Sequence, residues 1–187
     1  MNRTVVAYTP LGSQLLFKKM LGTEFVSNLF EFNITLVSKD SNLQGKDIIG
    51  QPITLEIDTE AGSPRYLNGL VTDFGYIGED EDEEDYHAYT CTARPFMWYL
   101  TQNTDSRVFV DKSVLDIANE VLSPFGFPFQ VKCQKGYRTR GFCVQYQENS
   151  FNFLNRLFEQ EGIYYYFTHS NGSHELVIAD DVGTLEA

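Results

Sequence analysis

The chain has 187 residues, of which 42% are hydrophobic and 21% are charged, a composition that can bury one large core or two modest β-rich domains and is not typical of a disordered protein. Its formal net charge of −12 at pH 7 argues against nucleic-acid binding, because phosphate recognition needs a basic face. No apolar segment reaches the roughly 18 to 20 residues that cross a bilayer, and residues 1–10 lack the apolar stretch of a secretory signal. We therefore expect synthesis in the cytoplasm, no signal peptide and no stable membrane insertion.

Residues 1–94 predict a first β-barrel-like domain. Phe30–Val37 alternates between apolar and polar residues, which is typical of a half-buried antiparallel strand. Its apolar side chains form one face: Phe30, Phe32, Ile34 and Leu36. Strands are also predicted at Ile53–Ile57 and Tyr66–Phe74, joined by a turn at Ala61–Pro64, and at Tyr86–Ala93. Four or five strands of this length favour a small barrel or sandwich.

An acidic run, Glu79–Asp85, lies between the last two of these strands and supplies much of the net charge. The simplest interpretation is the solvated tip of a hairpin. A metal site and a docking site for a basic partner are the alternatives. A binding module that recruits a basic partner through this loop is accordingly one hypothesis for the function of the chain.

Residues 95–187 predict part of a second domain that combines two helices with a β-hairpin. Pro95 interrupts strand pairing, and the apolar run 96–101 is expected to form a short helix. Val114–Leu122 places its apolar residues on one face of a helix. Candidate caps and helix breakers bound it on either side: Asp111, Ser113, Pro124 and Gly126.

A second helix is predicted over Phe151–Glu161, with Ser150 as a candidate cap and Gly162 as the residue that ends it. Its expected buried face consists of Phe151, Leu154, Leu157 and Phe158. The strands 163–168 and 175–181 follow, and Asn171 and Gly172 between them favour a tight turn. The chain is therefore expected to end in a β-hairpin.

The histidines of this hairpin are the strongest candidates for a metal site. His169 and His174 flank the turn and lie near Asp180 and Asp181 in sequence. A zinc site, however, usually offers three or four convergent ligands at repeated spacings. A solvated hairpin or an interface is the simpler interpretation, and no metal ligand is predicted.

The sequence shows no motif for nucleophilic catalysis or for nucleotide binding either. The sequence lacks a G-x-S-x-G nucleophile motif and a glycine-rich phosphate loop. Glu159 and Glu161 lie two apart on a helix and should diverge. Three cysteines without a CxxC pair predict reduced, largely buried thiols: Cys91, Cys133 and Cys143. The sequence thus predicts no catalytic residue, no cofactor and no enzymatic activity.

The most specific motif is the run Tyr137–Phe167, which contains R-L-F-E-Q-E-G-I at Arg156–Ile163 and is followed by H-E-L-V-I-A-D-D at His174–Asp181. This pattern resembles the VgrG family of type VI secretion spike proteins. Three earlier segments resemble the same family: Phe25–Phe32, Gly50–Leu55 and Arg94–Leu100. The resemblance therefore covers nearly the whole chain.

The resemblance implies a mainly β fold with a few helices, built from small β-barrel-like domains of the phage baseplate hub type, the second with packed helices. It implies a structural spike head that is a homotrimer in its full-length form, docks on a hexameric tube, contacts baseplate components and possible effectors, and is expelled into the medium or a target cell. Family members continue beyond this head, so the chain is expected to be truncated. A phage tail hub with cell-wall hydrolase function is the alternative.

Two features of the motif predict the environment of individual side chains. Arg156 is expected to pair with a carboxylate or a backbone carbonyl near the helix end, with an ordinary surface or packing arginine as the alternative. Tyr164, Tyr165 and Tyr166 alternate sides of a strand, so at least one ring should face outward. Such a ring belongs either to hairpin packing or to a subunit interface.

Overall fold

The computed structural model describes residues 4–60 and 62–184, and the chain divides into two compact units. Unit 1 contains the described parts of Met1–Glu24, Leu29–Pro95 and His169–His174. Unit 2 contains the described parts of Phe25–Asn28, Phe96–Thr168 and Glu175–Ala187. The chain therefore passes between the units more than once. The division into domains 1–94 and 95–187 stays a prediction.

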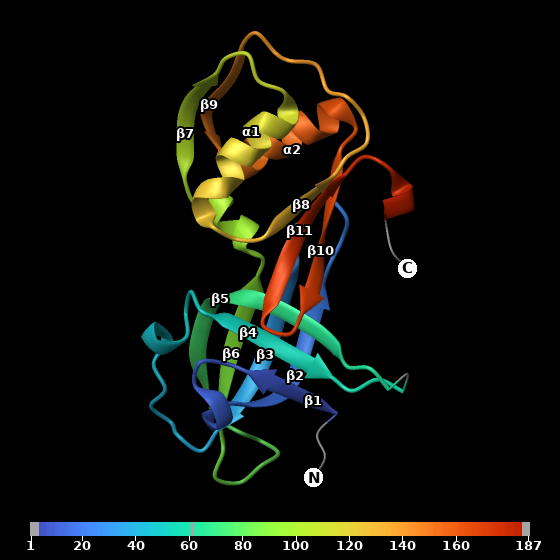
Figure 1. Ribbon diagram of the computed structural model, residues 1–187. Helices are drawn as coiled ribbons and strands as arrows, with labels where there is room; N and C mark the ends of the chain where they lie inside the picture. The colour runs from blue at the N-terminus through green and yellow to red at the C-terminus, as the bar shows by residue number, and fades with distance from the viewer. Residues whose placement is uncertain (1–3, 61, 185–187) are drawn as a thin grey trace. The chain divides into compact units, whose positions relative to one another are not determined.

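Unit 1 is built on one six-stranded antiparallel sheet, with the strand order β1-β4-β5-β6-β3-β2 (Figure 1). Its strands are β1 (Val5–Tyr8), β2 (Leu16–Thr23), β3 (Glu31–Ser38), β4 (Pro52–Ile57), β5 (Arg65–Glu79) and β6 (His87–Arg94). The first and last strands of this order, β1 and β2, approach each other, but among the described strands no ladder joins them. The sheet is therefore a curled, partly open barrel, and the predicted mainly β fold is confirmed.

Strand β5 bends this sheet. It has 15 residues, and its pairing with β6 shifts register between Val71 and Asp73 and again between Tyr76 and Gly78. Such bulges increase the local twist of a strand and curve the sheet. Consequently the first half of β5 lies in the core, whereas much of its second half is exposed. The predicted turn at 61–64 falls partly outside the described residues; Gly62 in it has a φ of +83°.

Strand β3 confirms the alternation read from the sequence. Phe32, Ile34 and Leu36 are buried on one face, and Phe30 just before the strand is buried with them. Two of the other three predicted strands depart from simple alternation, because Thr54 in β4 and Thr92 in β6 are also buried. Both threonines form hydrogen bonds to asparagine side chains on neighbouring strands, which compensates for removing their hydroxyls from water.

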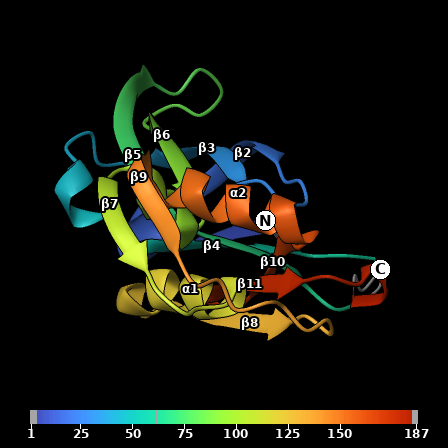
Figure 2. The same ribbon diagram turned by 90° about the horizontal axis from the view of Figure 1, so that it is seen from above.

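Unit 2 combines two helices with two small sheets. Its longer elements are the 3-10 helix η3 (Phe96–Thr101), β7 (Thr104–Phe109), α1 (Val114–Leu122), β8 (Phe129–Lys132), β9 (Cys143–Asn149), α2 (Ser150–Glu161), β10 (Tyr164–Ser170) and β11 (Ser173–Ala179), except that the hairpin residues His169–His174 belong to unit 1. Strands β7 and β9 form an antiparallel ribbon, while β10, β11 and β8 form a second sheet in which β11 and β8 are parallel. Helices α1 and α2 lie side by side (Figure 2).

Helix α1 matches its prediction at both ends. Ser113 is the N-cap, and Asp116 completes a capping box by accepting from the Ser113 backbone. A short 3-10 turn, Ser123–Phe125, follows, and Gly126 leaves it with a φ of +67°. The predicted apolar face is buried throughout: Val114, Ile117, Ala118, Val121 and Leu122. Local signals therefore determine this helix.

Helix α2 corrects two details of its prediction. The N-cap is Asn149 and not Ser150, because the Asn149 side chain accepts a hydrogen bond of 2.8 Å from the Asn152 backbone. Ser150 is the first helical residue, and its hydroxyl accepts from Arg107 instead. The buried face contains Phe153, Leu154, Leu157 and Phe158. Phe151 lies at the edge of this arc and is only half-buried.

Candidate functional site: an acidic cleft and a buried histidine cluster

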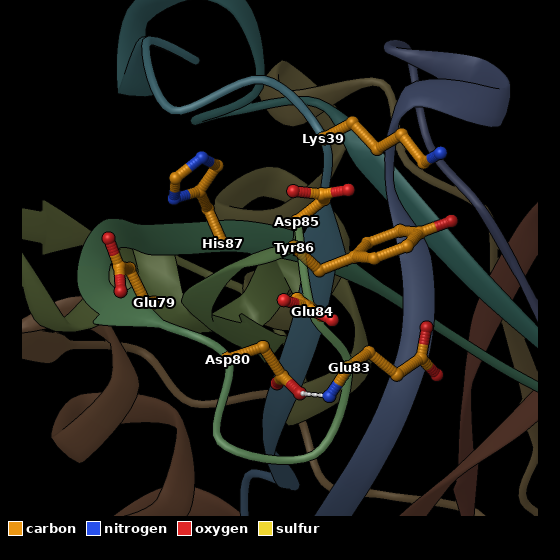
Figure 3. A pocket seen from close by; sticks show the side chains of 8 residues that line it. All are labelled: Lys39, Glu79, Asp80, Glu83, Glu84, Asp85, Tyr86 and His87. Carbon is orange, nitrogen blue, oxygen red and sulfur yellow. Dashed lines mark hydrogen bonds between the residues drawn. The ribbon is translucent and has the colours of Figure 1, made fainter.

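The first candidate site is an acidic cleft at the end of the β5–β6 hairpin in unit 1, with a volume of about 600 Å³. Its lining residues are Lys39, Glu79, Asp80, Glu83, Glu84, Asp85, Tyr86 and His87 (Figure 3). The loop that joins the two strands supplies most of the carboxylates. The only basic side chain in this lining is Lys39, whose ammonium lies 5.4 Å from the centre of the Tyr86 ring.

Asp80 anchors the acidic loop. Its Oδ1 accepts hydrogen bonds from the backbone N–H groups of Asp82 and Glu83, the second of which is drawn in Figure 3. Its Oδ2 accepts from Lys18 Nζ at 2.6 Å, and the Asp80 side chain is only 1% exposed. The Lys18 ammonium and the two backbone N–H groups lower the pKa of Asp80. The prediction of a solvated tip is therefore wrong for Asp80, and it holds for the exposed residues 81–85.

The loop carboxylates do not form a coordination site. In the part of the chain that the structure describes, no group of three or more histidine, cysteine, aspartate or glutamate side chains is placed to hold a metal ion. Lys18 bridges Asp80 and Asp82, at 2.6 and 2.7 Å, so two carboxylates already have a cation. The geometry is that of a charged loop fixed to strand β2.

The second candidate site is a polar group in unit 1, buried except for the exposed Glu24, which we call the histidine cluster: Glu24, Thr54, Asn68, His169 and His174. His174 Nδ1 lies 2.8 Å from Asn68 Oδ1, and Asn68 Nδ2 donates to Thr54 Oγ1 at 2.7 Å. His169 Nδ1 lies 3.1 Å from the Asn68 backbone nitrogen, while His169 Nε2 lies 3.2 Å from Glu24 Oε1. The two histidine rings flank the hairpin turn, with centroids 6.3 Å apart.

Burial determines the charge state of this cluster. His174 is 5% exposed, and its ring packs edge-on against Phe30 with centroids 5.5 Å apart. Burial first, and then the neighbouring His169, lowers the pKa of His174 to about 4. His174 is therefore neutral at pH 7. Of the two interpretations that the sequence offered, a solvated hairpin or an interface, the solvated hairpin is wrong, because both side chains are buried.

The aspartates near the histidines in sequence have a different role. Asp180, in unit 2, accepts hydrogen bonds from the backbone N–H groups of Gln134 and Lys135 and from the Tyr137 hydroxyl, at 2.9, 2.9 and 2.7 Å. The Gln134 backbone N–H and then the Tyr137 hydroxyl lower the pKa of Asp180 to about 2. This carboxylate therefore fixes the segment after β8.

Arg156 pairs as expected. Its NH2 group lies 2.5 Å from Glu148 Oε1 and 3.4 Å from the Val144 carbonyl. Glu161 pairs with Arg140 at 2.6 Å, whereas Glu159 is exposed, so the two glutamates diverge as predicted. Along β10 the alternation of the tyrosines is also confirmed, since Tyr165 is buried and its neighbours on both sides are half-buried.

The thiols lie mostly in the interior. Cys91 and Cys143 are buried, Cys133 is half-buried, and none of the three forms a disulfide. Burial raises the pKa of Cys91 to about 12, so its thiol is protonated at neutral pH.

Sequence reasoning missed Lys18, Thr54 and Asn68. A signal was present only for Asn68, which is a polar residue inside the apolar run Leu67–Val71. A buried amide in a strand needs partners, but the sequence does not identify them. Thr54 lies in an ordinary alternating position, and Lys18 lies at the register shift of β2 between Phe17 and Lys19, which the sequence does not mark.

Comparisons with known proteins agree with this fold. The family model of the phage tail baseplate hub (GPD) matches residues 23–187. The type VI secretion system spike protein VgrG1a of Pseudomonas aeruginosa is 37% identical over 185 residues, which are 98% of this chain and 28% of that protein. VgrG1b of the same organism is 35% identical over 188 residues, which are 100% of this chain and 25% of that protein. This chain thus spans little more than a quarter of these relatives.

Among solved structures, the c3393 protein of E. coli covers 99% of this chain and 51% of its own, with a TM-score of 0.81 and 21% identity. That protein is described as a component of the type VI secretion system with structural similarity to the T4 bacteriophage tail proteins gp27 and gp5. The likeness shows a shared fold, and the similarity to VgrG spike proteins expected from the sequence is confirmed. The chain belongs to the phage tail baseplate hub (GPD) family.

Proposed function

We propose that this chain is the structural head of a type VI secretion spike, which docks on a hexameric tube and is expelled with it. The observation that carries the proposal is the 37% identity to a spike protein over 98% of the chain. The chain spans only 28% of that relative, so the identity alone does not assign the activity and partners of the whole spike. We propose them here.

Charged side chains used as structural ties support a mechanical role. Arg94 in β6 pairs with Glu31 in β3 through Nε and NH2, at 2.9 and 2.5 Å, and with Thr72 in β5 through NH1 at 2.6 Å. Three strands of unit 1 are thereby joined. A comparable group in unit 2 joins β7, β9 and α2: Arg107, Gln145 and Ser150. Such ties stiffen a part that transmits force.

We further propose that the full-length spike is a homotrimer that also contacts baseplate components and effectors. The β7–β9 ribbon supports an assembly role, because its outward face carries large exposed apolar side chains. Tyr146 is 69% exposed and Val108 is 56% exposed, and alternation places both on the outward side of the ribbon. Phe142 and Val110, next to the ends of β9 and β7, are 68% and 54% exposed. Exposed apolar patches of this kind mark protein interfaces.

Assembly in the cytoplasm followed by expulsion through the contractile apparatus completes the proposal. Within residues 4–60 and 62–184, no helix has the length and apolar character needed to cross a membrane. Expulsion predicts that the spike appears in the culture medium only when the apparatus can contract. Equal release from cells without a working apparatus would refute this part.

The decisive experiment measures binding of the full-length spike to the tube protein by co-elution with light scattering. We expect a complex whose spike component has the mass of a trimer. The variant Tyr146→Asp should weaken assembly without lowering the unfolding temperature. Ile77→Asp, at another exposed apolar position, is the matched control. Failure of the native spike to bind the tube protein would overturn the proposed function.

A further inference from the structure

Basic side chains gather in one stretch of unit 2 that has no acidic residue. The chain contains 26 aspartates and glutamates, but none of them lies between Val121 and Gln147. The same stretch contains four lysines and arginines: Lys132, Lys135, Arg138 and Arg140. We propose that the first three of these, which we call the basic surface, bind the exposed carboxylates of the acidic loop, Glu79–Asp85, in a second copy of this chain. This inference rests on the proposed homotrimer and assigns one of its contacts.

The cations of the basic surface are available to a partner. Lys135 and Arg138 are exposed, and Lys132 is half-buried. Within residues 4–60 and 62–184, no carboxylate forms an ion pair with any of the three. The charge of Asp180 interacts with that of Lys135, but Asp180 is only 8% exposed. The surface of this segment is therefore positive in a chain whose formal net charge is −12.

The segment that carries the basic surface is held near both ends. Near its start, Asp180 accepts hydrogen bonds from the backbone N–H groups of Gln134 and Lys135, both at 2.9 Å. Just after it, the Arg140 backbone donates to the Lys112 carbonyl at 3.0 Å and accepts from the Lys112 N–H at 3.2 Å. A segment that is already ordered loses little conformational entropy when it binds.

Charge complementarity selects the partner. The acidic loop in unit 1 contains seven consecutive carboxylates, and Lys18 binds two of them. Glu81, Glu84 and Asp85 are exposed, and among the described residues they form no ion pair; Figure 3 shows the last two. Because Asp80 fixes the loop, these carboxylates form an ordered surface of opposite sign to the basic surface.

The two surfaces allow every copy to make the same contact twice. The basic surface belongs to unit 2 and the acidic loop to unit 1, so a contact between copies joins two different surfaces. Such heterologous contacts form a closed ring when the rotation permits, and a ring of three copies is the proposed homotrimer. The basic surface is also followed along the chain by Phe142, next to the apolar ribbon face proposed for assembly.

Carbodiimide cross-linking of the native chain tests the contact without any variant. Unlabelled and isotope-labelled chains are mixed in equal amounts and cross-linked, and the linked peptides are identified by mass spectrometry. We expect mixed-label links between the lysines of the basic surface and the acidic loop. A link from Lys18 to Asp82, 2.7 Å apart in one chain, should never have mixed labels and is the internal control. An absence of mixed-label links from the basic surface would overturn the contact.

Neutralising the basic surface measures its contribution. Lys135→Gln with Arg138→Gln should weaken self-association about five- to thirtyfold, measured by light scattering across a concentration series. The variant removes two positive charges, so the formal net charge changes from −12 to −14 and the repulsion between copies also grows. Lys46→Gln with Arg65→Gln makes the same change at exposed positions of unit 1 and is the matched control. Equal weakening in both would assign the effect to overall charge and overturn the contact.

Neutralising the acidic loop distinguishes the contact from overall repulsion by the sign of the effect. Glu81→Gln with Glu84→Gln removes two negative charges and changes the formal net charge from −12 to −10. Overall repulsion would then fall and association would strengthen, whereas loss of the contact weakens it. We expect weakening, and strengthening would overturn the inference.

Two further outcomes separate this contact from other partners and from the proposed function. If Lys135→Gln with Arg138→Gln abolishes binding to phosphatidylglycerol vesicles and leaves self-association unchanged, the surface binds a membrane and the inference is overturned. A native spike that gives mixed-label links but does not bind the tube protein would overturn the proposed function and support the contact.

Discussion

The packing between helices α1 and α2 of unit 2 and the interior of the unit 1 sheet use different chemistry. In unit 2, α1 and α2 pack through aliphatic and aromatic side chains, so the cost of a substitution depends on volume. Unit 1 encloses a hydrogen-bonded amide and an imidazole beside its aromatic rings. In unit 1 the free-energy cost of a substitution therefore depends on which hydrogen-bond partners are lost and on the protonation state of the imidazole. The comparison predicts that the packing between α1 and α2 responds mainly to cavities, and that the interior of unit 1 responds mainly to pH and to lost hydrogen bonds.

The largest effect is expected in unit 2. Phe153→Ala removes a fully buried ring that stacks on Phe109 with centroids 5.4 Å apart. The expected loss is about 3 to 5 kcal/mol of the free energy of unfolding, measured by denaturant titration. Phe151→Ala, at the half-buried edge of the same helix, should cost clearly less. Equal losses would contradict the assignment of the α2 face.

The pH dependence of stability should single out unit 1. Because the folded pKa of His174 is about 4 against an ordinary 6.5, its contribution is complete above pH 6.5 and is lost as the pH falls toward 4. The loss reaches up to about 3 kcal/mol at pH 4. Denaturant titrations at several pH values measure it. A His174→Gln chain should show a flatter profile, and an identical profile would assign the loss to other groups.

Removing the Asn68 side chain tests how much the hydrogen bonds of the histidine cluster contribute to the stability of unit 1. Asn68→Ala leaves the Nδ1–H of His174 without its acceptor and Thr54 without its donor, and is expected to cost about 1 to 3 kcal/mol. Asn42→Ala, at an exposed loop position of unit 1, serves as the control and should cost less. If both variants unfold at the same denaturant concentration, the cluster does not stabilise unit 1.

The smallest expected effect concerns the cap of α2. Asn149→Ala removes the acceptor for the Asn152 backbone N–H and should cost about 1 kcal/mol. Asn152→Ala keeps that N–H and removes an exposed side chain, so thermal unfolding should show almost no change. A larger loss in Asn152→Ala would reverse the assignment of the cap.

Features set by neighbouring residues were predictable from the sequence. Helix α1 has its cap, its apolar face and its terminating glycine within 14 residues, from Ser113 to Gly126, and β3 alternates from Glu31 to Leu36. The cap of α2 was misassigned because Asn149 and Ser150 are both good caps and differ by one position. Boundaries of this kind depend on backbone geometry more than on residue type.

The candidate site depended on contacts between distant residues. His174 and Asn68 are 106 positions apart, and no local pattern pairs them. Periodicity marked each strand but not the register that aligns these side chains. Similarly, Asp80 looked like one acidic residue among seven, and its burial follows from Lys18, which lies 62 positions earlier.

The placement of His169–His174 in unit 1 also constrains the order of folding. A chain emerging from the ribosome completes strand β6 at Arg94, but the segment that covers Asn68 follows only after roughly 80 further residues, a delay of about 4 to 16 seconds at ordinary synthesis rates. During this time the buried amide and the Phe30 ring lack their final cover. Unit 1 is therefore complete only after the segment His169–His174, one of the last of the described chain, has been synthesised.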